Sequence, residues 1–111
     1  MDTKVIAWPT ERTRNWETFH DVCAETFGFP DYYGRNMNAW IDCMTYLDEP
    51  DTRVSVAKGG LVVIRVEEAE KFASRCPEQH AALLEYTAFV NHRRVEAGEP
   101  PILALMLVGH Y

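Results

Sequence analysis

The acidic residues of this chain are concentrated in one short stretch. Residues 36–51 contain four acids and no base, whereas the whole 111-residue chain has seventeen acids, eleven bases and a formal net charge of −6. Carboxylates at this density can pair with the cations of a basic partner, or can simply keep an exposed surface soluble. The acidic balance argues against direct binding of nucleic acid, because phosphates are contacted mainly by Lys and Arg.

Three polar side chains in this stretch share one side of a predicted helix. Asn38, Asp42 and Thr45 are separated by four and three residues, the spacing that places side chains on one helix face. A loop that contains two adjacent tyrosines precedes them. This polar face is therefore either a binding surface or an ordinary solvated helix surface.

The residue types used in catalysis and metal binding form no recognisable pattern. None of the four histidines is spaced from another in the way that zinc ligands are. Cys43 directly follows Asp42, and a neighbouring carboxylate raises the pKa of a thiol instead of activating it. The sequence has no glycine-rich phosphate loop and no G-x-S-x-G motif. We therefore expect no enzymatic activity, no metal and no cofactor.

Apolar periodicity predicts four helices. The first is expected after a cap at Thr13 and ends at Gly28, and the second begins after a cap at Asn36 and closes near Asp48. Residues 67–75 and 77–97 are expected to form the other two helices. The buried side of the second helix is predicted to consist of five apolar residues, Met37, Trp40, Ile41, Met44 and Leu47.

Three apolar runs predict strands, at residues 5–7, 61–66 and 102–108. Two helices separate each strand from the next, which is typical of a small α/β fold with a parallel sheet. The last run is almost continuously apolar, which favours a central strand. We therefore expect one α/β domain over residues 1–111, with a roughly three-stranded parallel sheet packed with about four helices.

The cysteines and the N-terminal residues predict a cytoplasmic protein. Three widely spaced cysteines, Cys23, Cys43 and Cys76, are an odd number and are typical of free thiols in a reducing compartment. The N-terminal residues show no secretion signal, and the longest apolar run, of about eight residues, is far shorter than the roughly 20 that span a membrane. We expect a monomer that does not associate with membranes.

The segment from Pro30 to Thr45 resembles the signature of the barstar family of intracellular ribonuclease inhibitors. Its sequence, PDYYGRNMNAWIDCMT, agrees with the pattern P-[DE]-Y-Y-G-x-N-x-x-A-x-x-D-C-x-T at every specified position. Elsewhere the likeness lies in the order of elements and in the apolar strand that follows Ala97-Gly98. Close matching thus covers about one-seventh of the chain.

The resemblance implies inhibition by plugging an active site. In the family, the Tyr-Tyr-Gly loop and the following helix enter the cleft of a small basic ribonuclease, where acidic side chains occupy the places of RNA phosphates. Such a cleft is rich in cations, so a carboxylate on a rigid helix can pair with them. The partner-binding residues that the resemblance implies are Tyr32, Gly34, Asn36, Asn38, Asp42 and Thr45.

The resemblance also assigns roles within this set. Asp42 matches the principal acidic contact, and Tyr32 matches the tyrosine that contacts the enzyme. We expect Tyr33 to belong to the core, and Gly34 to provide a positive φ in a tight turn. Asp51 is expected to be a rim acid that alters the rate of association.

Three residues depart from the family's founding member. Asn38 replaces a carboxylate, Ile41 replaces an aromatic residue, and Arg93 lies near a position that is acidic there. These departures point to a related but different nuclease, or to a target that is not a nuclease. The function expected is therefore an immunity-type inhibitor of a basic ribonuclease or nuclease toxin. The alternative is a barstar-fold interaction module for a non-nuclease partner.

Overall fold

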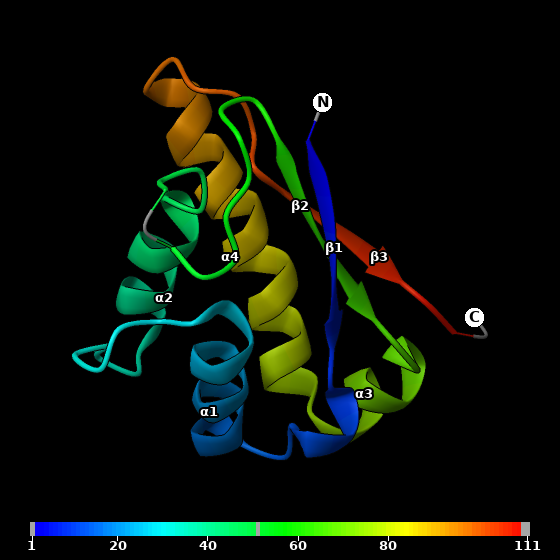
Figure 1. Cartoon of the computed structure of the whole chain (residues 1–111). Helices are drawn as coiled ribbons and strands as arrows, with labels where there is room; N and C mark the ends of the chain where they lie inside the picture. The colour runs from blue at the N-terminus through cyan, green and yellow to red at the C-terminus, as the bar shows by residue number, and fades with distance from the viewer. Residues whose placement is uncertain (1, 51, 110–111) are drawn as a thin grey trace.

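A three-stranded parallel sheet and four α-helices make up the described part of the chain, which the computed structural model gives for residues 2–50 and 52–109 (Figure 1). The fold class and the order of elements predicted from the sequence are confirmed. The elements are β1 (Thr3–Trp8), the 3-10 helix η1 (Thr10–Arg12), α1 (Trp16–Phe27), α2 (Met37–Thr45), β2 (Leu61–Val66), α3 (Ala69–Arg75), α4 (Pro77–Glu96) and β3 (Leu103–Leu107).

The sheet has the strand order β1-β2-β3, with Val63 of β2 paired to Val5 on one side and Ala104 on the other. The expectation that the last strand is central is wrong, because β3 lies at an edge and its Met106 is 44% exposed. The two crossovers step in the same direction, so β2 lies in the middle, and crossovers of the usual right hand then put their helices on one side of the sheet. Figure 1 shows α1, α2 and α4 together on that side of the sheet.

Helix α1 begins two residues later than expected. Its cap is Asn15, whose Oδ1 accepts from the Thr18 amide at 2.9 Å, while the Thr18 hydroxyl accepts from the Asn15 amide at 3.0 Å. This reciprocal capping box explains the start of the helix. Thr13, the predicted cap, is instead buried and accepts a hydrogen bond from Trp8 Nε1 at 3.0 Å. Gly28 ends the helix with φ 68°, as predicted.

Helix α2 confirms both its predicted cap and its predicted buried side. Asn36 Oδ1 accepts from the Ala39 amide at 2.8 Å, which fixes the first turn. Trp40 is fully buried and donates its indole N–H to Cys23 Sγ at 3.3 Å, so that α2 is tied to α1. The other predicted core residues of this segment are buried, apart from Met37, which is half-buried. This packing fixes the position of α2 and leaves its opposite side exposed.

Within the described residues, no helix is both long and apolar enough to span a membrane.

Candidate functional site

The two tyrosines of the loop before α2 have opposite environments. Tyr33 is buried and shares a hydrogen bond with His20 Nδ1 on α1, at 2.6 Å between the ring nitrogen and the phenol oxygen. The Tyr33 ring also packs against Phe29, with ring centroids 4.7 Å apart. Tyr32, by contrast, is 88% exposed. The loop is therefore anchored to the core by one tyrosine and presents the other to solvent, as the sequence predicted.

The turn between Tyr33 and α2 differs from the expected one. Gly34 does not have a positive φ; the neighbouring Arg35 does, at 54°. A Cβ at Gly34 would lie 3.2 Å from Asn36 Nδ2, which donates a hydrogen bond to the Gly34 carbonyl. Glycine therefore provides space for the capping side chain. The strained Arg35 is held by its own side chain, which donates to Asp21 Oδ1 at 2.7 Å and to the Glu17 carbonyl at 3.0 Å.

Five of the six predicted binding residues are exposed in the loop before α2 and along α2, and we call them together the loop–helix surface. Its members are Tyr32, Gly34, Asn36, Asn38 and Asp42. The sixth, Thr45, was predicted to contact a partner, but it is buried. It is 6% exposed, and its hydroxyl donates to the Ile41 carbonyl at 2.6 Å. Thr45 lies on the side of α2 that packs into the protein, so its hydroxyl is satisfied within the helix.

Asp42 is already paired within the chain. Its Oδ1 accepts from Arg93 Nη1 of α4 at 2.9 Å, and both side chains stay partly exposed, at 65% and 41%. A groove of about 670 Å³ runs between α2 and α4 at this point. The groove is lined by Asn38, Ile41, Asp42, Tyr86, Phe89 and Arg93. Ile41 is buried, so its chief role is packing between the two helices.

The negative charge predicted for residues 36–51, which form α2 and the segment after it, is largely offset by cations from elsewhere in the chain. Asp48 is buried and pairs with Arg94 Nη2 at 2.9 Å, and Lys58 Nζ lies 3.4 Å from the same carboxylate. Burial alone would raise the pKa of Asp48, but hydrogen bonding and the charges of Arg94 and Lys58 bring it below its usual value. Lys58 also lies 3.7 Å from Glu49. Asp51 falls outside the described residues.

Beside Tyr32, a smaller pocket of about 270 Å³ separates the loop from the end of α2. Its lining includes Tyr32, Asp42 and Cys43, together with Tyr46, which is 50% exposed and was not predicted as a site residue. The signal for Tyr46 was its position four residues after Asp42, about one helical turn farther, at the residue that caps the C-terminal end of α2. Burial, and secondarily the Asp42 charge, raises the pKa of the Cys43 thiol, which fits the expectation of an unreactive cysteine.

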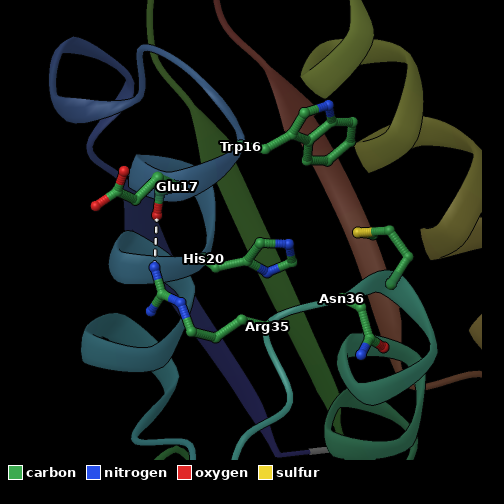
Figure 2. Close-up of a pocket in the computed structure, with 6 residues that line it drawn as sticks. Trp16, Glu17, His20, Arg35 and Asn36 are labelled. Atoms are coloured by element: carbon green, nitrogen blue, oxygen red, sulfur yellow. Dashed lines mark hydrogen bonds between the residues drawn. The ribbon is translucent and has the colours of Figure 1, made fainter.

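A second pocket, of about 390 Å³, lies between α1 and the start of α2 (Figure 2). Figure 2 shows Trp16 and His20 projecting from α1 toward the side of this space occupied by Asn36, with Arg35 bonded to the Glu17 carbonyl. Trp16 and His20 are stacked, with ring centroids 6.1 Å apart. Burial and then the Arg35 charge lower the pKa of His20, with the Asp21 charge opposing them.

The buried His20 predicts that stability falls in mild acid. Its folded-state pKa is lowered, so the unfolded chain binds the proton more readily, and stability is lost as pH falls below about 6.5 toward the folded-state pKa. We expect His20→Gln to flatten this dependence in urea unfolding measured between about pH 7 and pH 5. His92→Gln is the matched control, because His92 is 67% exposed and pairs with the surface acid Glu96. An unchanged slope in His20→Gln would contradict the assignment.

Among the described residues, no three His, Cys, Asp or Glu side chains are grouped so that they could hold a metal ion.

A family model and a curated protein both match this chain. The family model described as "Barstar (barnase inhibitor)" covers residues 3–105. A Bacillus subtilis (strain 168) protein named "Putative ribonuclease inhibitor YrdF" is 49% identical over 41 residues, which amount to 36% of this chain and 45% of that protein. The alignment with this relative thus spans a little under half of its length.

Proposed function

Because the chain belongs to the barstar family, we propose that it is a protein inhibitor of a small basic ribonuclease. The loop–helix surface enters the enzyme's active-site cleft, and the interaction needs no chemistry from the inhibitor itself. The observation that supports this most directly is the pairing of an exposed Tyr32 with an exposed Asp42 around one pocket. An aromatic side chain and a carboxylate side by side match a cleft that binds bases and phosphates.

The anchoring of the loop favours tight binding. Tyr33 and His20 hold the loop to α1, and Arg35 holds the turn to the same helix, so Tyr32 extends from a fixed backbone. A side chain presented in this way loses little conformational entropy when it is buried by a partner. Tyr32 therefore serves as a preorganised contact at the mouth of the cleft.

Asp42 supplies the charge that the cleft recognises. When a partner arginine or lysine reaches Asp42, a charge-assisted hydrogen bond forms, worth about 1.5–3 kcal/mol net. The carboxylate thereby occupies the place of a substrate phosphate, so RNA and inhibitor compete for the same cations.

The test is inhibition of RNA cleavage by a basic ribonuclease captured from the native cytosol on the immobilised chain. We expect stoichiometric inhibition by the wild type and at least a tenfold weaker effect of Tyr32→Ala, since hot-spot aromatic residues cost about 2 kcal/mol or more. Met106→Ala, which removes a 44% exposed apolar side chain from the edge strand β3, is the control, because Met106 does not belong to the loop–helix surface. Equal inhibition by Tyr32→Ala would contradict the proposed role of the loop.

The alternative is an interaction module whose partner is not a nuclease. It is favoured by the pairing of Asp42 with Arg93 and by the neutral Asn38, which together leave the loop–helix surface less acidic than the sequence indicates. The same capture separates the two functions, because a partner that binds through Tyr32 but lacks ribonuclease activity supports the alternative.

A further inference from the structure

Two consecutive arginines of α4 reach acids of the α2 region, but they do so in different surroundings. Arg94 is 5% exposed and pairs with the buried Asp48, which makes it part of the structural core. Arg93 is 41% exposed and pairs with Asp42 on the loop–helix surface. Arg93 therefore lies on the surface where the partner is proposed to dock, and the acid that it pairs with among the described residues is the exposed Asp42.

A partner that covers Asp42 must also cover Arg93. Their charged atoms are 2.9 Å apart, and both side chains line the groove between α2 and α4. The same groove carries Phe89, which is 48% exposed and extends the contact area onto α4. The interface on this side is thus mixed in charge, with one carboxylate, one guanidinium and an apolar residue.

The mixed charge determines which clefts can bind. A cleft that offers only cations takes Asp42 away from Arg93 and leaves the guanidinium facing like charges, away from bulk water. An unpaired buried charge and like-charge contacts both weaken a complex strongly. A cleft that also offers a carboxylate satisfies both groups at once.

We infer that Arg93 is a specificity-determining residue, which disfavours ribonucleases whose clefts present only cations and favours a target with a carboxylate facing α4. This inference rests on the proposed function and names the class of ribonuclease that the chain inhibits. Selectivity arises here from a repulsive element built into the surface as much as from the attractive Asp42.

The test uses barnase, the ribonuclease named in the family description, as a purified probe, on the premise that the part of its cleft that meets α4 presents cations. Dissociation constants are measured by surface plasmon resonance at low salt for wild type, Arg93→Ala and Arg93→Glu. We expect Arg93→Ala to bind barnase about tenfold or more tightly than wild type, and Arg93→Glu to bind more tightly again.

Arg65→Ala is the matched control. Arg65 has the same side-chain exposure as Arg93, 41%, and it also pairs with a surface acid, Glu67, at 2.7 Å. It lies on β2 between the inward-facing Ile64 and Val66, so it points to the opposite side of the sheet. The control makes the same change in net charge far from the proposed interface.

The dissociation constants of the Arg93 variants and of Arg65→Ala, each compared with that of wild type, test the role of Arg93. Tighter binding by both Arg93 variants, with Arg65→Ala close to wild type, supports it, even where wild type itself binds barnase weakly. Unchanged or weaker binding by the Arg93 variants overturns it, as does an equal gain in Arg65→Ala. Failure of the proposed function is seen separately, as equal inhibition of the native ribonuclease by wild type and Asp42→Ala.

Discussion

Asp42→Ala is expected to weaken binding of the ribonuclease partner by roughly 30- to 5,000-fold. The substitution removes a charge-assisted hydrogen bond and leaves the partner's cation buried without a counter-charge, which together cost about 2–5 kcal/mol. The loss should appear mainly as faster dissociation, because truncating a buried charged contact acts on the complex more than on the encounter. Stopped-flow association and surface plasmon resonance dissociation measure the two rates.

The size of this effect is judged against a surface acid outside the loop–helix surface. Glu67 pairs with Arg65 at 2.7 Å and is 47% exposed, so Glu67→Ala breaks a comparable ion pair with the same change in charge. We expect Glu67→Ala to stay within about threefold of wild type, mostly through the association rate and its dependence on salt. Should Asp42→Ala bind as tightly as Glu67→Ala, the chain would share the family's fold without its mode of inhibition.

The parts of the site that the sequence predicted correctly are set mostly by residues close together in the chain. The Asn36 cap and the buried side of α2 depend on neighbours within one or two helical turns, whereas the contrast between Tyr32 and Tyr33 was expected from the tyrosine pair of the family motif and is fixed by the contact of Tyr33 with His20 on α1. Such local patterns determine which side of a helix is buried and where the helix begins. For this reason the start of α2 and its buried side were predictable before any tertiary contact was known.

The parts that the sequence did not predict depend on contacts between distant segments. Arg93 lies 51 residues from Asp42, and Arg94 lies 46 residues from Asp48, so a local count of acids could not include the cations that offset them. Thr45 shows the same limit, because its backbone carbonyl is held by Arg94 and its side chain is covered. The position of β3 at the sheet edge likewise depends on the direction of the crossovers, which apolar content does not encode.

Arg94→Ala is expected to destabilise the protein by about 3–5 kcal/mol, the largest effect on stability that the ion pairs of this chain predict. The substitution leaves Asp48 as a buried carboxylate with Lys58 as its remaining cation. Arg94 also donates to the Thr45 carbonyl at 2.7 Å and to the Pro100 carbonyl at 2.8 Å, so the end of α2 and the approach to β3 lose their shared support. Urea unfolding followed by circular dichroism measures the change.

The neighbouring residue provides the control for this prediction. Arg93→Ala removes the same side chain one position earlier in α4, but it breaks an exposed pair, for which about 1 kcal/mol or less is expected. Stability should also fall as pH drops through the lowered pKa of Asp48, because protonation removes the charge that Arg94 satisfies. This acid-side loss should shrink in Arg94→Ala. Equal destabilisation by the two arginine variants would show that burial does not distinguish the pairs, and would place the support of α2 elsewhere in the fold.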